Sequence, residues 1–266
     1  MKLKRKILVG TYTVPILFGT GEIFKGDGKG IYTYSLENGF LILQEEPVWA
    51  ENPSYLTVNR SRTMLYAVNE LKEYQGQAGG AISCFSFHPE TNKIVFQKSF
   101  FTGGGDPCFV AEDPQNGLVY VCNYAGGSLA VFPQENTGML KECSQLISYS
   151  GSGGDPFRQS VPHVHSVFFS LDGNYVFVVD LGTDNIRCYR VTGKEKILLK
   201  TDGGAVFRPG SGPRCGIFHP NGKFCYVVHE LLSTVSALEY CKESGKLTEF
   251  QTISTLPQDF CGSSTA

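Results

Sequence analysis

The chain has 266 residues, of which 41% are hydrophobic, and a formal net charge of -2 at pH 7. This length and composition allow a sizeable core, and the near-neutral charge argues against nucleic acid or an anionic membrane as a partner. Glycine (31 residues), Phe (19) and Tyr (13) are plentiful and Met is scarce (3), which is typical of short strands joined by turns. We therefore expect an all-β protein without a membrane segment.

The cysteines and the amino terminus indicate a cytoplasmic protein. The nine cysteines are odd in number, form no CxxC pair and lie mostly among apolar residues, which favours reduced, buried thiols. Basic residues precede an apolar run at the start of the chain, as in a signal peptide. However, Thr11, Thr13 and Pro15 interrupt that run and no small-residue cleavage site follows, so we expect mature sequence from the start.

A segment of eighteen residues occurs four times in the chain, and each copy ends in an apolar strand. The copies, which start at residues 53, 107, 164 and 213, are PSYLTVNRSRTMLYAVNE, PCFVAEDPQNGLVYVCNY, VHSVFFSLDGNYVFVVDL and PRCGIFHPNGKFCYVVHE. A period near 50 residues is typical of propellers and similar arrays. Each copy is followed by a further strand, a turn and a more variable fourth strand. Four strands per unit predict the blades of a β-propeller.

The start of the chain fits as a unit that lacks its first strand, because ILVGTY, GKGIYTYSL and FLILQEE match strands two to four. We expect one incomplete propeller domain with units at about 7–52, 53–106, 107–163, 164–212 and 213–266. The closing residues LPQDFCGSSTA resemble another connection between blades. An open ring exposes strand edges, so we expect a fragment of a longer propeller that, when expressed alone, is unstable or aggregates and has little activity.

Two positions of the repeat are predicted to line one mouth of the propeller channel. The first strand of a blade runs along the channel and the second strand is antiparallel to it. The residue that begins the first strand and the residue that closes the second therefore lie at the same mouth of the channel. The residues after each start are Ser54, Cys108, His165 and Arg214. The residues that close the second strands are Asn69 and Glu70, Asn123 and Tyr124, Asp180 and Leu181, and His229 and Glu230. We expect His165, Arg214, Glu70, Asp180 and Glu230 around one mouth, with Arg158 on the same face.

Imidazole, guanidinium and carboxylate groups at a concave mouth are typical of a small-molecule site. Strand-end polar residues also cap β-ladders, but His165 and Arg214 share one repeat position in adjacent units, which favours a site. Glu70 is open to either interpretation, and Asp180 precedes a turn-like LGTDN that its carboxylate is expected to organise. The candidate substrate-binding residues are Arg158, His163, Glu70, Asp180 and Asn123.

Other chemistries have weaker support. There is no GxSxG elbow and no phosphate-binding GxxxxGK[ST] loop. His163 and His165 have the spacing that places both side chains on one side of a strand, but no convincing third ligand is nearby, and we expect neither a metal nor a cofactor. Cys108 could be a nucleophile, although a free cysteine is more often a small apolar filler.

Several motifs resemble the seven-bladed propeller lactonases, a family that includes bacterial propeller-type 6-phosphogluconolactonases and the fungal carboxymuconate lactonizing enzyme. The matching motifs are ILVGTYT, NPSYLTV with LYAVNE, RQSVPHVHSV with VFVVDLGTDNI, GPRCGIFHPNGKFCYVVHEL and LPQDFCG. The resemblance implies about five of seven blades and a metal-free site made by His165 (His163 being the less favoured choice), Arg214 and Glu230. It also implies an arginine beyond Ala266. Cys215 departs from the family, in which histidine is common at that position.

The resemblance implies a lactonase that converts 6-phosphogluconolactone to 6-phosphogluconate in the pentose phosphate pathway, with a small-molecule lactone as partner. Hydrolysis needs a base, for which His165 and Glu230 are both candidates, and positive charge at the oxyanion, which Arg214 would supply. Arg158 would hold a sugar phosphate. The alternatives are a carboxymuconate-type cycloisomerase and a non-catalytic ligand- or protein-binding propeller, against which the charged mouth argues.

Overall fold

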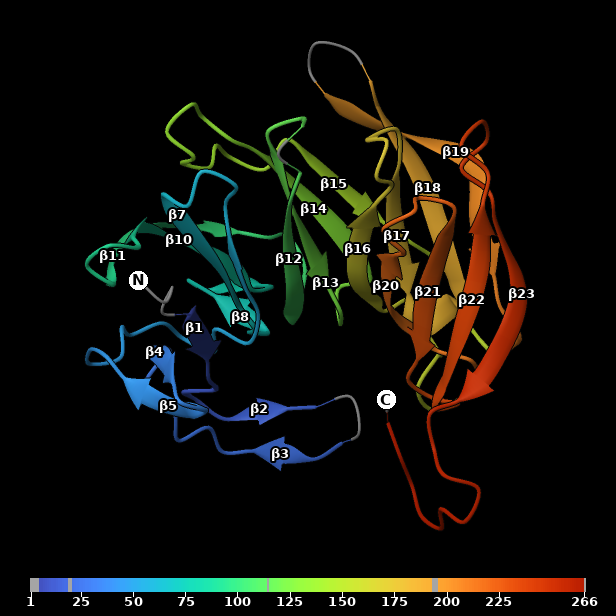
Figure 1. The fold of residues 1–266 in the computed structure, drawn as a ribbon, viewed down its shortest axis with the longest axis horizontal. Helices are drawn as coiled ribbons and strands as arrows, with labels where there is room; N and C mark the ends of the chain where they lie inside the picture. The colour runs from blue at the N-terminus through green and yellow to red at the C-terminus, as the bar shows by residue number, and fades with distance from the viewer. Residues whose placement is uncertain (1–4, 19–20, 114, 193–195, 266) are drawn as a thin grey trace. The chain divides into compact units, whose positions relative to one another are not determined.

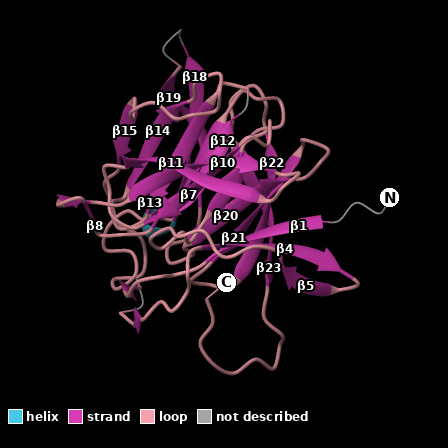
Figure 2. Ribbon diagram, turned by 90° about the vertical axis from the view of Figure 1, so that its left-hand side faces the viewer, coloured by secondary structure: helices cyan, strands magenta, loops and turns pink. Residues whose placement is uncertain are grey.

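The structure is a computed structural model that describes residues 5–18, 21–113, 115–192 and 196–265. Strands dominate these ranges, and the helical element is a single 3-10 turn, η1 (Leu181–Thr183) (Figure 2). This confirms the expected all-β class. None of the helical structure described is long and apolar enough to cross a membrane.

Five main sheets follow one another along the chain (Figure 1). Their strands are β1 (Arg5–Gly10), β4 (Ile31–Glu37) and β5 (Phe40–Leu43); β6 (Leu56–Val58), β7 (Met64–Asn69), β10 (Ala81–His88) and β11 (Lys93–Phe101); β12 (Pro107–Asp113), β13 (Leu118–Asn123), β14 (Ser128–Pro133) and β15 (Gln145–Ser148); β16 (Val164–Phe169), β17 (Val176–Asp180), β18 (Asn185–Thr192) and β19 (Ile197–Val206); β20 (Pro213–Phe218), β21 (Phe224–His229), β22 (Thr234–Tyr240) and β23 (Leu247–Ser254). In every sheet the strands pair in chain order, which is the meander of a propeller blade. The first sheet has three strands, as the sequence predicts.

Burial differs from strand to strand within a blade. Every residue of β7, β13 and β17 is buried, whereas all but the first residue of β23 are exposed. A strand covered on both faces needs a continuous apolar run rather than alternation, which is why the second strand of each repeat is the most apolar segment of the sequence. The polar residues that end these strands are therefore anchored on rigid, buried elements.

The chain forms two compact units, one of residues 1–121 with 130–144 and the other of residues 122–129 with 145–266. The first unit has a buried cluster that includes Tyr66, Phe100 and Phe132. The second has its own cluster, in which the rings of Phe168 and Phe177 stack with centroids 5.0 Å apart. The expected single domain and its unit boundaries stay a prediction.

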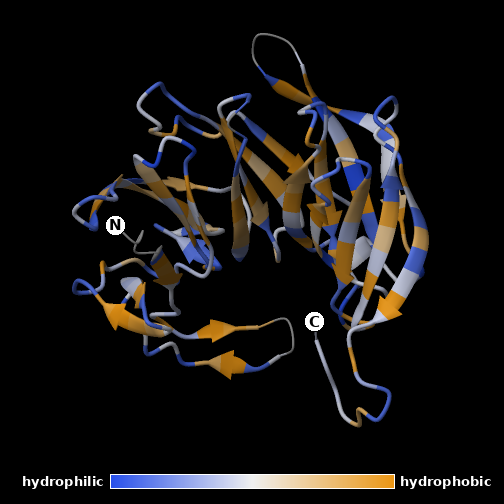
Figure 3. Ribbon diagram, viewed as in Figure 1, coloured by the Kyte–Doolittle hydropathy of each residue, from blue (hydrophilic) through white to orange (hydrophobic). Residues whose placement is uncertain are grey.

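Two short hairpins were not predicted: β2 (Ile16–Leu17) with β3 (Ile23–Phe24), and β8 (Glu73–Tyr74) with β9 (Gln77–Ala78). Both lie in connections between longer strands of the first unit. Strands of two residues are too short to show the alternation of apolar and polar residues that predicts a strand. The first unit also exposes apolar side chains along β5, of which Phe40 is 72% exposed. The ribbon of this strand is orange, the hydrophobic end of the scale, in Figure 3. All nine cysteines are free; four of them are buried, whereas Cys241 and Cys261 are exposed, so the expectation of buried thiols holds only in part.

Candidate active site

The second unit places His165 and Arg214 at matching irregularities in two neighbouring sheets. Along β16 the pairing with β17 shifts between Val164 and Ser166, and along β20 the pairing with β21 shifts between Pro213 and Cys215. The register steps over His165 in one strand and over Arg214 in the other, so each is the extra residue of a β-bulge. Bulges re-aim side chains and are common beside active sites. The shared repeat position found in the sequence is therefore a shared backbone distortion.

Two carboxylates hold the loops around these bulges. Asp180 caps η1 by accepting hydrogen bonds from the backbone N–H groups of Gly182 (3.0 Å) and His163 (2.8 Å). Asp184, in the left-handed region with φ 54°, accepts hydrogen bonds from the backbone N–H groups of Gly210 and Gly212, each at 2.8 Å. Carboxylates that bond backbone donors in this way make loops rigid.

Two glycines allow the close backbone approaches that position His163 and Glu230. A Cβ on Gly182 would lie 2.1 Å from the carbonyl oxygen of Val161, so η1 can pack against the segment that leads into β16 only with glycine there. Gly212 has φ 62°, and its carbonyl accepts a hydrogen bond from the Glu230 N–H at 2.8 Å. The left-handed conformation favours glycine because it has no Cβ.

The centre of the site is one carboxylate that binds two guanidinium groups. Arg158 Nη2 donates to Glu230 Oε1 at 2.6 Å, and Arg214 Nε donates to Glu230 Oε2 at 2.9 Å. The side chains of Glu230 and Arg158 are 10% and 18% exposed, whereas that of Arg214 is 41% exposed. Arg214 therefore reaches solvent while Glu230 holds its Nε. With His165 neutral, the cluster carries one net positive charge.

His165 lies beside this clamp, with Nε2 4.0 Å from Glu230 Oε2 and a side chain that is 10% exposed. Burial, together with the positive charge of Arg214, lowers the pKa of His165 to about 4, although Glu230 opposes the change. Desolvation disfavours a charged imidazole. The ring is therefore neutral near pH 7 and can accept a proton.

Tyr124 is a site residue that sequence reasoning missed. Its ring stacks on that of His163 (centroids 4.3 Å apart, planes at 12°) and meets His165 edge-on at 5.8 Å. Its hydroxyl accepts a hydrogen bond from Arg158 Nη2 at 3.3 Å. Its position in the repeat could have indicated a role in the site, because Tyr124 closes the second strand of its blade and Glu230 closes the second strand of another blade. Tyr124 was not among the predicted site residues.

The sequence also missed the residues that hold Arg158. Asp155 accepts hydrogen bonds from the Arg158 N–H (2.9 Å) and the Phe157 N–H (2.8 Å), which fixes the turn before the arginine. The buried amide of Gln159 then donates to the Leu181 carbonyl and to Asp184, both at 2.7 Å. Arg158 is thus joined to the same loop frame as the two bulges.

Besides Arg158, three expected substrate-binding residues lie in the second unit, and two of them, Asp180 and Asn123, are fully buried. Asp180 is fully buried, and besides its backbone donors it accepts from Arg187 Nη1 at 2.6 Å. Asn123 is fully buried and donates to Ser128 Oγ at 3.0 Å, and His163 Nδ1 lies 3.0 Å from the Tyr124 carbonyl oxygen. We therefore assign Asp180 and Asn123 to the framework rather than to the substrate, because burial removes them from contact with it.

Glu70 belongs to the first unit, where its carboxylate accepts a hydrogen bond from the Tyr12 hydroxyl at 2.9 Å. Its expected place beside Glu230 at one mouth stays a prediction. Within the ranges that the structure describes, no three His, Cys, Asp or Glu side chains are arranged to hold a metal ion.

Comparison with known proteins places the chain in a family. The family described as Lactonase, 7-bladed beta-propeller matches residues 6–266. The 6-phosphogluconolactonase of Bacillus subtilis is 34% identical over 258 residues, which cover 96% of this chain and 68% of the relative. That of Formosa agariphila is 31% identical over 214 residues, which cover 80% of this chain and 60% of the relative.

Solved structures agree with this placement. The periplasmic gluconolactonase of Pseudomonas aeruginosa is 31% identical, with a TM-score of 0.84 over 97% of this chain and 70% of that protein. The repeats, the bulged site and these relatives lead to one conclusion: the chain belongs to the family of seven-bladed β-propeller lactonases.

Proposed function

We propose that this protein hydrolyses an anionic sugar lactone, with 6-phosphogluconolactone as the substrate and 6-phosphogluconate as the product. Membership of a lactonase family supports hydrolysis of a cyclic ester. The relatives from Bacillus subtilis and Formosa agariphila are named for the phosphorylated sugar lactone. In this role the protein would serve the pentose phosphate pathway in the cytoplasm.

The observation that carries the proposal is the clamp of Arg158 and Arg214 on Glu230 beside a neutral imidazole. One carboxylate offsets only one of the two guanidinium charges, so the cluster attracts an anionic ligand. Glu230 also holds both arginines in place, which lowers the entropy lost when a substrate binds. The same arrangement favours an anion over a neutral or apolar ligand.

The geometry favours His165 over Glu230 as the general base. Both carboxylate oxygens of Glu230 are already engaged as acceptors of hydrogen bonds from guanidinium groups. His165 is neutral at pH 7, and the imidazolium formed on proton uptake would lie 4.0 Å from Glu230 Oε2. A bound anionic lactone would also raise the pKa of His165.

The proposed reaction uses one water molecule. Its oxygen forms a bond to the lactone carbonyl carbon while His165 Nε2 takes a proton, and the negative charge that develops on the carbonyl oxygen faces Arg214. The ring C–O bond then breaks, and the proton on His165 passes to the departing alkoxide, which gives a hydroxy acid and the neutral imidazole. Positive charge at a developing oxyanion is a large contribution to acyl-transfer catalysis.

Arg158 is the proposed phosphate ligand. Its side chain is only 18% exposed and is held by Glu230 and Tyr124, so its guanidinium is presented in a fixed orientation. A planar guanidinium matches the geometry of phosphate oxygens. Phosphorylated lactones should therefore be preferred over unphosphorylated ones.

The test is turnover in ¹⁸O-labelled water with two substrates, 6-phosphogluconolactone and gluconolactone, after subtraction of the uncatalysed rate. Hydrolysis by acyl attack places one ¹⁸O atom in the product carboxylate, whereas a cycloisomerase incorporates none during turnover. We expect a higher kcat/KM for the phosphorylated lactone, and Arg158→Lys should reduce this preference. Equal kcat/KM for the two lactones would refute the phosphate assignment, and turnover without ¹⁸O would refute hydrolysis.

A further inference from the structure

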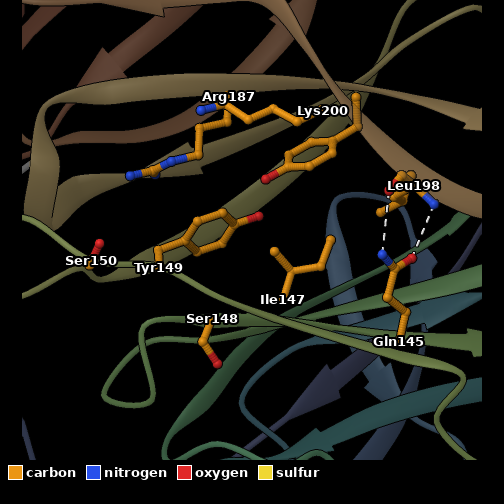
Figure 4. Close-up of a pocket in the computed structure, with 9 residues that line it drawn as sticks. Gln145, Ile147, Ser148, Tyr149, Ser150, Arg187, Leu198 and Lys200 are labelled. Atoms are coloured by element: carbon orange, nitrogen blue, oxygen red, sulfur yellow. Dashed lines mark hydrogen bonds between the residues drawn. The ribbon is translucent and has the colours of Figure 1, made fainter.

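A polar cavity of about 440 Å³ in the second unit shares no residue with the cluster around Glu230 (Figure 4). Strands β15 and β19 contribute to its wall, and Gln145 on β15 is joined to the backbone of Leu198 on β19 by two hydrogen bonds, at 3.0 and 3.3 Å. The lining residues are Gln145, Ile147, Ser148, Tyr149, Ser150, Arg187, Tyr189, Leu198 and Lys200. Its volume lies in the range of small-molecule sites, which is about 300–1,000 Å³.

The charged residues of this lining are both cations. Arg187 and Lys200 lie on one side of the cavity in Figure 4, and no Asp or Glu is among its described lining residues. Tyr149 supplies a hydroxyl group on the other side, and Ser148 and Ser150 also line the cavity. Burial raises the pKa of Tyr149, so its hydroxyl keeps its proton at neutral pH. The lining therefore offers positive charge and hydroxyl donors together.

Arg187 is held in position before any ligand arrives. Its Nη1 donates to Asp180 Oδ2 at 2.6 Å, its Nη2 donates to Thr183 Oγ1 at 3.3 Å, and its guanidinium carbon lies 4.3 Å from the centre of the Tyr149 ring. Its side chain is 13% exposed. Asp180 offsets the charge of Arg187. The exposed Lys200 therefore gives the cavity one net positive charge. A pre-positioned guanidinium loses little entropy on binding.

We propose that this cavity is a binding site for a phosphorylated sugar or polyol, separate from the site of lactone hydrolysis. The guanidinium of Arg187 and the ammonium of Lys200 would bind the phosphate, because both are common phosphate ligands. The hydroxyl and amide groups would bind the sugar hydroxyls, and Ile147 and Leu198 would pack against its carbon face. A neighbouring cavity of about 580 Å³ shares Arg187 and Lys200 but also contains Asp202 and Glu249, which makes it less suited to an anion.

The experiment follows the methyl resonances of Ile147 and Leu198 in isotopically labelled protein during titration with glucose 6-phosphate. Glucose, which lacks the phosphate, and inorganic phosphate, which lacks the sugar, are titrated in parallel. Lys200→Gln removes one cation from an exposed position, so it should not affect folding. Lys223→Gln, another exposed lysine of the same unit that does not line the cavity, is the matched control.

Saturable shifts of both residues are expected with glucose 6-phosphate, with weaker binding of inorganic phosphate and none of glucose. Lys200→Gln should raise the Kd by about tenfold, a change typical of losing one charged contact, and Lys223→Gln should leave it unchanged. Both variants should keep the lactonase rate, so a loss of lactone turnover would be recognised as a separate failure. The proposal is overturned if neither residue shifts, if glucose binds as well as glucose 6-phosphate, or if Lys200→Gln has no effect.

Discussion

Glu70 and Glu230 occupy the same position of the repeat but have different surroundings. In the second unit, Glu230 binds two guanidiniums and lies beside His165. In the first unit, Glu70 accepts a hydrogen bond from Tyr12, and the residue that corresponds to Arg214 is Ser54. Burial, followed by the charge of Glu70, raises the pKa of Tyr12, so this tyrosine is a neutral donor rather than a counter-ion.

The comparison shows that the repeat supplies a position and the residues around it supply the chemistry. In both units the carboxylate follows the second strand of a blade, which is fully buried before Glu70 and partly buried before Glu230. Only with arginines as partners does it become part of a charged cluster suited to an anionic substrate, because a carboxylate bound to a neutral hydroxyl leaves no positive charge for the ligand. Five predictions test the chemistry of the second unit and its difference from the first.

Arg214→Ala should produce the largest effect. Removing one donor to a developing oxyanion typically lowers kcat by about a hundred- to a thousandfold. Steady-state kinetics on 6-phosphogluconolactone measure the loss, with the exposed Arg208→Ala as the control for a missing surface charge. Near-normal turnover by Arg214→Ala would remove this residue from the mechanism.

Acidification should destabilise the protein through His165. Its pKa in the folded protein, about 4, lies below the ordinary value of 6.5, so the unfolded chain binds the proton first as the pH falls. The contribution of His165 to the free energy of unfolding is fully present above pH 6.5. It falls by about 3 kcal/mol as the pH is lowered from 6.5 to 4. Urea unfolding across this range measures the loss, which should be smaller in His165→Asn.

The lowered pKa of His165 should also be visible in the pH dependence of kcat/KM. With His165 as the base, the acid limb of the profile should lie near pH 4 rather than near pH 6.5, because kcat/KM reports the free enzyme. A limb near pH 6.5 would contradict this prediction, because it would mean either that another group is the base or that the pKa of His165 is not lowered.

Glu230→Gln and Glu70→Gln compare the two carboxylates directly. Glu230→Gln removes the charge that orients both arginines and should lower kcat by about a hundredfold, as small displacements of catalytic groups do. Glu70→Gln can still accept the Tyr12 hydrogen bond and should leave kcat unchanged. A rise in KM alone would support the substrate-binding role expected for Glu70, and equal losses of kcat would contradict the distinction between the sites.

Tyr124→Phe and Tyr12→Phe should have the smallest effects. Tyr124→Phe removes the acceptor for Arg158 and should raise KM by about fivefold, since a single hydrogen bond contributes about 1 kcal/mol. Tyr12→Phe should reduce the free energy of unfolding by about 1 kcal/mol and leave KM unchanged. If Tyr124→Phe changes stability but not KM, Tyr124 belongs to the framework rather than to the site.

The sequence predicted the blades well because their signal is local and repeated. Apolar second strands such as Met64–Asn69 and Val176–Asp180 lie where the alignment of the repeats placed them. The hairpin of Ile16–Leu17 with Ile23–Phe24 was missed because two-residue strands carry no pattern of their own. The repeat register also brought out His165, Arg214 and Glu230, which the structure joins.

The sequence by itself determined the class of fold, the repeat and the shared position of His165 and Arg214, because these depend on spacing along the chain. It left open the choice between His165 and Glu230 as the base and the roles of Asp180 and Tyr124. The tertiary structure shows the contacts of Asp180 and Tyr124 and supports the proposal of His165 as the base, because these depend on which side chains approach one another. Arg158 and Glu230 are 72 residues apart, yet their side chains bind at 2.6 Å.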